Sequence, residues 1–177
     1  RVAATLEHPN VVRSFPIVEH EGEVGLPMGL VWGEDVRRIV ERGLALQRPL
    51  PQELAVRIIE QAARGLACFH GQRAPDGEPL GLVHRDVSPP NLMVTFGGQV
   101  KVLDFGIAKA EQDYMRVRPG QLPGKFSYMS PEQVTGLEVD ARADQFSLGI
   151  MLVELTTLRR LFKGESDLAT MVLVAET

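Results

Sequence analysis

Residues 82–94 read LVHRDVSPPNLMV, and this stretch decides how the rest of the chain is interpreted. Two short apolar segments bracket an acid, two basic residues, two prolines and an asparagine. Pro89 and Pro90 each restrict the backbone φ angle, which stiffens the segment between the apolar runs. We therefore interpret this segment as a rigid loop that holds polar side chains beside a buried core.

A hairpin predicted over residues 92–103 brings a further acid to the same place. Asp86 and Asn91 precede its first strand, and Asp104 follows its second strand. Because the hairpin is short, we expect the three side chains to converge at one end of it. Two carboxylates and a carboxamide make an oxygen-rich group that suits Mg²⁺ together with phosphate oxygens and water. The alternative is that Asp86 and Asn91 only cap backbone N–H groups of the loop.

The other elements are predicted from hydrophobic periodicity and turn residues. Residues 52–69 carry apolar side chains at helical spacing, whereas β-prone runs bounded by turn residues indicate strands. The expected elements are the last turn of a helix over 2–6, hairpin strands over 11–19 and 24–31, helices over 34–46, 52–69 and 141–157, and strands over 92–95 and 100–103.

The composition is that of one globular domain of 177 residues, with 44% hydrophobic and 24% charged residues. A net charge of -4 and the lack of a basic run argue against a nucleic-acid partner. No run approaches the roughly 20 apolar residues of a membrane-spanning helix, so no membrane segment is predicted in this stretch. The single cysteine, Cys68, forms no internal disulfide, which favours a reducing, cytoplasmic location.

Five motifs resemble those of eukaryotic-type (Hanks-type) Ser/Thr protein kinases, and in particular the bacterial members of that family. Residues 84–91, HRDVSPPN, resemble the H-R-D-x-x-x-x-N catalytic loop, and residues 104–106 resemble D-F-G. The other three are HPN at residues 8–10 for H-P-N, SPE at 130–132 for A-P-E, and DQFSLG at 144–149 for D-x-W-S-L-G.

The resemblance implies an α+β, protein-kinase-like two-lobed fold in truncated form. Residues 1–28 would be a remnant of the small β lobe, residues 29–33 the hinge, and residues 34–177 an incomplete helical large lobe. The Gly-rich phosphate loop and the ATP-binding lysine of the family have no counterpart in these residues. We therefore expect this stretch, by itself, neither to bind ATP tightly nor to transfer phosphate.

The implied activity is transfer of the ATP γ-phosphoryl group to a Ser or Thr hydroxyl of a protein substrate. Asp86 would accept a hydrogen bond from that hydroxyl and act as a base late in the transfer. Arg85 and Ser88 belong to the same catalytic loop, and Asn91 and Asp104 would hold Mg²⁺ on the phosphates of ATP.

Residues 28–31, MGLV, resemble the hinge between the lobes. Met28 would be the gatekeeper, and backbone groups of Gly29 and Val31 would contact adenine. Gly29 replaces the acidic residue usual in the family, but a backbone contact tolerates that change. The alternative is that these residues are only the end of a strand.

Two residues depart from the family pattern. Ser88 stands where a lysine usually reaches the γ-phosphate, and a single contact of that kind is typically worth about 10²- to 10³-fold in rate. Lys125 stands where the substrate-binding loop usually has a threonine. Residues 107–125 contain no Ser or Thr, so we expect no switch by a phosphothreonine that pairs with Arg85. The hydroxyls left in the segment are those of Tyr114, Ser127, Tyr128 and Ser130.

The departures keep two other functions open. A pseudokinase scaffold would bind a nucleotide or a partner without turnover, and Ser88 and Lys125 favour it, whereas Asp86, Asn91 and Asp104 oppose it. A small-molecule kinase of related fold is the third interpretation. The motif at residues 130–132 and the long segment before it suit a protein substrate better.

Overall fold

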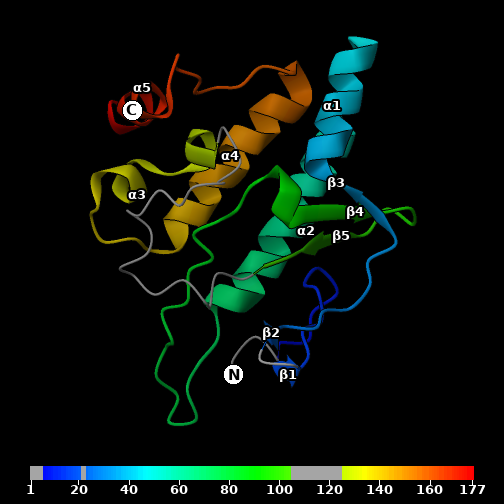
Figure 1. Cartoon of the computed structure of the whole chain (residues 1–177), viewed down its shortest axis with the longest axis vertical. Coiled ribbons are helices and arrows are strands. Elements are labelled where there is room, and N and C mark those ends of the chain that lie inside the picture. The colour runs from blue at the N-terminus through cyan, green and yellow to red at the C-terminus, as the bar shows by residue number, and fades with distance from the viewer. Residues whose placement is uncertain (1–5, 21–22, 105–124) are drawn as a thin grey trace.

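The computed structural model describes residues 6–20, 23–104 and 125–177. A helical part and two small antiparallel sheets make up the molecule (Figure 1). The strands are β1 (Val18–His20), β2 (Glu23–Gly25), β3 (Gly33–Asp35), β4 (Leu92–Thr95) and β5 (Val100–Val102). The α-helices are α1 (Val36–Leu46), α2 (Gln52–His70), α3 (Pro131–Thr135), α4 (Ala141–Thr157) and α5 (Asp167–Ala175), and the 3-10 helices are η2 (Pro89–Asn91) and η4 (Lys125–Tyr128).

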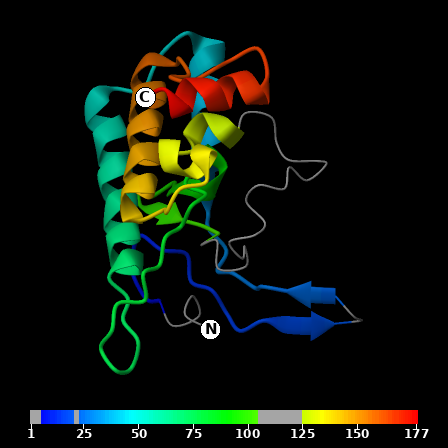
Figure 2. The ribbon, with the colours of Figure 1, turned by 90° about the vertical axis from the view of Figure 1, so that its left-hand side faces the viewer.

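Helices α2 and α4 pack side by side (Figures 1 and 2). Helix α2 turns one stripe inward, and Leu66 and Phe69 on that stripe are almost completely buried. Met151 and Leu155 of α4 belong to the same core. The predicted helices 52–69 and 141–157 are thereby confirmed to within one residue. The first carries apolar side chains at a helical period, and the second is apolar along most of its length.

Strands β3, β4 and β5 form an antiparallel sheet in that order. Strand β3 was not predicted: residues 34 and 35 were expected in a helix that begins instead at Val36. The Asp35 side chain caps that helix by accepting a hydrogen bond from the Arg38 N–H at 2.8 Å. Gly33 permits the pairing because an added Cβ atom would lie 2.2 Å from the Val94 carbonyl oxygen.

The N-terminal hairpin projects away from the helical part (Figure 2). Strands β1 and β2 are much shorter than the predicted runs over 11–19 and 24–31. Antiparallel pairing resumes further along, where Ser14 bridges Met28. Pro16 and Pro27 lack the N–H group that a ladder requires, which explains the interruption. The predicted helical turn over 2–6 and the turn over 21–23 lie largely outside the described residues.

Residues 10–12 connect this hairpin to the second sheet. The Val12 N–H donates to the Val102 carbonyl at 2.9 Å, and the Val102 N–H donates to the Asn10 carbonyl at 2.9 Å. The Asn10 side-chain amide also donates to the Val100 carbonyl at 3.0 Å. The asparagine of the HPN motif therefore fastens the N-terminal segment to β5.

The C-terminal part packs η4 and α3 against α5. Phe126, Met129, Val134 and Val174 form a small second core there. None of the helices formed by the described residues is both long and apolar enough to span a membrane.

Candidate catalytic loop and magnesium site

The carboxylate of Asp144, on α4, holds the start of the candidate catalytic loop, residues 84–91. It accepts hydrogen bonds from the backbone N–H groups of His84 and Arg85, both at 2.9 Å. The His70 ring nitrogen Nε2 lies 2.7 Å from the same carboxylate. Asp144 is only 1% exposed, so these partners compensate a buried charge that would otherwise be costly. The DQFSLG motif thus anchors the loop that carries Asp86.

The backbone adopts positive φ angles at two non-glycine residues of this site. Arg85 has φ of 63° and Asp104 has φ of 49°. Such angles are uncommon outside glycine and occur where the surrounding structure imposes them. At Arg85 the surroundings are clear: Asp144 binds its N–H, and the Gln133 side chain donates to its carbonyl at 2.8 Å.

His84 connects the loop that carries Asp86 to the end of the β4–β5 hairpin, where Asp104 lies. Its Nδ1 atom accepts a hydrogen bond from the Asp86 N–H at 3.2 Å, so Nε2 carries the proton and donates to the Leu103 carbonyl at 2.8 Å. The ring is fully buried. His84 therefore links the residue before Asp104 to the loop of Asp86, and it holds the loop rather than acting as a base.

Asn91 makes the second connection between these ends. Its side-chain amide donates to the Asp86 carbonyl at 2.8 Å, and its own carbonyl accepts from the Leu103 N–H at 2.9 Å. Leu92 pairs with Val102 at one end of the β4–β5 hairpin. Asn91 precedes β4 and Asp104 follows β5, so both residues lie at this end. Asp104 is exposed there.

These residues fit a magnesium site that is completed by a nucleotide. The Asn91 nitrogen is engaged with Asp86, which makes its side-chain oxygen the atom suited to a cation. Among the residues that the structure describes, no group of three His, Cys, Asp or Glu side chains forms a metal site. Mg²⁺ is commonly held by one or two protein oxygens, with phosphate oxygens and water as its other ligands.

The Asp86 side chain has a partner that the sequence did not reveal. Its Oδ2 atom lies 3.0 Å from the Nζ atom of Lys125, and the two side chains are 16% and 17% exposed. Ser88 is also buried, and its hydroxyl donates to the Asp86 carbonyl at 3.4 Å, which is long for a hydrogen bond. Asp86, Ser88 and Lys125 line one crevice of about 10 Å³.

The residues predicted to form the hinge occupy the segment between β2 and β3. Met28 is 41% exposed and pairs with Ser14, and the Gly29 N–H donates to the Arg13 carbonyl at 2.8 Å. Val31 is half-buried. The contacts of these residues with adenine stay a prediction.

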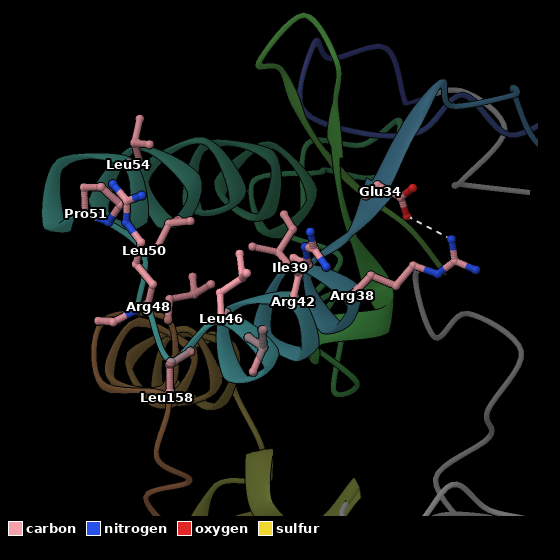
Figure 3. A pocket seen from close by; sticks show the side chains of 14 residues that line it. Glu34, Arg38, Ile39, Arg42, Leu46, Arg48, Leu50, Pro51, Leu54 and Leu158 are labelled. Carbon is pink, nitrogen blue, oxygen red and sulfur yellow. Dashed lines mark hydrogen bonds and ion pairs between the residues drawn. The ribbon is translucent and has the colours of Figure 1, made fainter.

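A pocket of about 620 Å³ lies among α1, the start of α2 and the end of α4 (Figure 3). Its walls are mostly apolar, with Ile39, Leu50 and Leu158 among them. None of the residues proposed for catalysis, metal or adenine lines this pocket. The proposed site at the loop of Asp86 is therefore separate from this cavity.

Comparison with known proteins agrees with the motifs. The family model described as protein kinase domain matches residues 1–176. The chain is 44% identical over 171 residues to the Tyrosine-protein kinase MasK of Myxococcus xanthus, an alignment that covers 97% of this chain and 26% of that protein.

Two further relatives are named as Ser/Thr kinases. The chain is 34% identical to drp72 of Corynebacterium efficiens, over 97% of this chain and 32% of that protein. It is 37% identical to PknB of Mycobacterium leprae, over 94% of this chain and 26% of that protein. The chain thus spans about a quarter to a third of the length of these relatives.

The matches confirm the family and the α+β kinase fold class expected from the motifs. The chain belongs to the protein kinase family and is similar over nearly its whole length to bacterial Ser/Thr kinases.

Proposed function

We propose that the full-length protein transfers the γ-phosphoryl group of ATP to a Ser or Thr hydroxyl of a protein substrate. One observation carries this proposal: the Asn91 side chain is bonded to the Asp86 carbonyl at 2.8 Å, at the end of the hairpin where Asp104 follows β5. This arrangement suits a carboxylate that orients a hydroxyl beside two metal ligands.

In the proposed reaction, Asp86 accepts a hydrogen bond from the substrate hydroxyl and aims its oxygen at the γ-phosphorus. A bond forms between that oxygen and the γ-phosphorus, while the bond from the γ-phosphorus to the bridging oxygen breaks and ADP leaves. The hydroxyl proton passes to the Asp86 carboxylate late in the transfer. Asn91 and Asp104 would hold Mg²⁺, which when bound neutralises negative charge on the phosphates.

The Arg85 backbone keeps Asp86 in place. The Arg85 N–H donates to Asp144 of α4, and the Arg85 carbonyl accepts from Gln133 of α3. These two hydrogen bonds restrict the backbone directly before Asp86. Preorganisation of this kind is how kinases contribute to a reaction in which the protein forms no covalent bond.

The proposed nucleotide contacts lie in the hinge. Because the Gly29 N–H is bonded to Arg13, we assign its carbonyl to the adenine amino group, and the Val31 backbone to a second contact. Met28 would stand behind the adenine.

The proposed location is cytoplasmic. The half-buried Cys68 packs against the core, which suits a thiol in a reducing, cytoplasmic setting.

The choice of Ser and Thr as acceptors rests on Pro89. In tyrosine kinases this part of the catalytic loop reads A-A-R-N or R-A-A-N instead. Here Pro89 is buried and is the first residue of η2. One relative is named as a tyrosine kinase and two as Ser/Thr kinases. Phosphoamino acid analysis of the autophosphorylated full-length protein tests the choice: we expect phosphoserine or phosphothreonine, and phosphotyrosine alone would contradict it.

The transferase itself is tested with Asp86→Asn in the full-length protein. We expect transfer from γ-labelled ATP to a generic protein substrate to fall by several orders of magnitude, with Asp76→Asn, an exposed loop variant, as the matched control. A scaffold that binds without turnover is favoured by the lack of a lysine at Ser88. In that case the wild type and Asp86→Asn would both be inactive and bind nucleotide equally well.

A further inference from the structure

The ion pair between Lys125 and Asp86 joins two departures that look unrelated in the sequence. The chain lacks a lysine at residue 88 and has an unexpected one at residue 125. The structure places the Lys125 Nζ atom 3.0 Å from Asp86 Oδ2. Both side chains are more than four-fifths buried, so their attraction is screened less than that of a surface pair.

Residue 88 cannot deliver a positive charge to this place. Ser88 is short, neutral and 7% exposed, and its hydroxyl points back to the Asp86 carbonyl. Ser88 and Lys125 nevertheless line the same crevice beside Asp86. A cation is thus present where residue 88 would bring one, but it comes from the opposite segment of the chain.

The backbone that carries Lys125 is firmly held. Lys125 begins η4, whose next three residues are buried. The Tyr128 carbonyl accepts from the Ser147 hydroxyl at 2.7 Å, and the Tyr128 hydroxyl donates to the Glu154 carboxylate, so η4 is fastened to α4 at two points. Helix α4 also carries Asp144, which holds the loop of Asp86. One helix therefore positions both members of the ion pair.

We propose that Lys125 takes over the role of the lysine that is missing at residue 88. This inference rests on the proposed function. Lys125 acts as a positioning residue: it orients the Asp86 carboxylate and places a positive charge beside the phosphoryl group while that group moves from the bridging oxygen of ATP to the substrate oxygen. Lys125 keeps its protons throughout, and the hydroxyl proton still goes to Asp86.

The test moves the lysine back to residue 88 in the full-length protein. We expect Lys125→Thr to lower kcat about 10²- to 10³-fold with little change in the KM for ATP. The double variant Ser88→Lys with Lys125→Thr should regain most of that loss. A structural role for Lys125 would not be rescued by a lysine on another segment. Lys163→Thr, which removes an exposed lysine, is the matched control and should behave as wild type.

A second readout does not depend on activity. Because Lys125 and Asp86 form an ion pair, the loss of Tm in the double variant Asp86→Asn with Lys125→Thr should be smaller than the sum of the losses in the two single variants. A loss of Tm in the double variant equal to the sum of the two single losses would overturn the proposal. Where Lys125→Thr lowers the folded fraction, Lys125→Gln, which keeps most of the side-chain length without the charge, carries the same comparison.

The kinetic outcomes separate this inference from the proposed function. An inactive wild type would overturn the proposed function and this inference with it. An active wild type together with a fully active Lys125→Thr would overturn the inference alone. The inference alone would also be overturned if the folded double variant Ser88→Lys with Lys125→Thr had a kcat no higher than that of Lys125→Thr.

Discussion

Asp144 Oδ1 accepts a hydrogen bond from the Arg85 N–H at 2.9 Å, across 59 positions of sequence. Arg85 has a positive φ angle, which a non-glycine residue adopts only when neighbouring groups hold it there. The conformation of the candidate catalytic loop is therefore maintained from helix α4. Substitution of Asp144 should therefore disturb the loop, although this residue lies on α4 and not in the loop.

Asp144→Asn tests this dependence. The carboxamide offers one acceptor oxygen in place of two, so either the His84 or the Arg85 N–H loses its partner. We expect the free energy of unfolding to fall by about 1–3 kcal/mol, the cost of one unsatisfied buried donor. Urea denaturation measures it.

The control for this variant is Asp76→Asn. Asp76 is exposed and accepts one hydrogen bond, from the Glu78 N–H, which an asparagine oxygen also accepts. Its stability should equal that of wild type. If both variants were equally stable, Asp144 would not be what holds the loop.

Tyr128→Phe tests the attachment of η4 to α4. The Tyr128 hydroxyl donates to the Glu154 carboxylate, and both side chains are buried. Removing the hydroxyl leaves a buried carboxylate with one donor fewer, which should cost about 1.5–3 kcal/mol. Thermal or urea unfolding at neutral pH measures this loss.

The same pair predicts a pH dependence. Burial and the neighbouring Glu154 raise the pKa of Tyr128 well above its ordinary value. A pKa that is raised in the folded state means that stability is fully present below the unfolded pKa of about 10 and is lost as the pH rises toward the folded pKa. The stability of wild type should thus decline above about pH 10, by up to about 1.4 kcal/mol per pH unit more than that of Tyr128→Phe. Parallel curves for the two proteins would contradict the raised pKa.

The hydroxyls of Ser127, Tyr128 and Ser130 are poor acceptors for regulatory phosphate. Ser127, Tyr128 and Ser130 are at most 7% exposed in the folded protein. Tyr114, the remaining hydroxyl of the segment, lies outside the described residues. We expect mass spectrometry of the full-length protein after incubation with ATP to find no stoichiometric phosphate on the three buried hydroxyls. Stoichiometric phosphate on any of them would disprove this.

Gly33→Ala tests the pairing of β3 with β4. The new Cβ atom would lie 2.2 Å from the Val94 carbonyl oxygen and 2.6 Å from the Thr95 Cα atom, so the strands must separate. We expect a loss of about 1–3 kcal/mol in the free energy of unfolding, as for overpacked positions. Gly97→Ala is the control, because its Cβ atom would meet nothing closer than 3.8 Å. Similar stabilities would mean that β3 does not depend on the missing side chain.

Several elements were predictable because their signals are local. Strand β4 and helix α4 have the bounds expected from apolar runs and turn residues, and α2 differs by one residue. Strand β3 was missed because residues 33–35 carry no β-prone pattern of their own. They are extended because β4 lies beside them, which is a tertiary effect.

The candidate site was predictable in part. The short hairpin predicted over residues 92–103 placed Asp86, Asn91 and Asp104 at one end of it, and the hydrogen bonds among residues 84, 86, 91 and 103 agree with that placement. The partner of Asp86 was not predictable from spacing. The only signal was a paired substitution, a lysine lost at residue 88 and one gained at residue 125.

By itself, the sequence determined the family motifs and the elements whose periodicity lies within a few neighbouring residues. Tertiary structure decided which of these residues touch, because contacts such as Lys125 with Asp86 and Asp144 with Arg85 join positions 39 and 59 residues apart. Hydrophobic patterns specify that a helix is buried, but not which loop its polar residues will meet. That choice arises only when α2, α4 and the β4–β5 hairpin pack around one core.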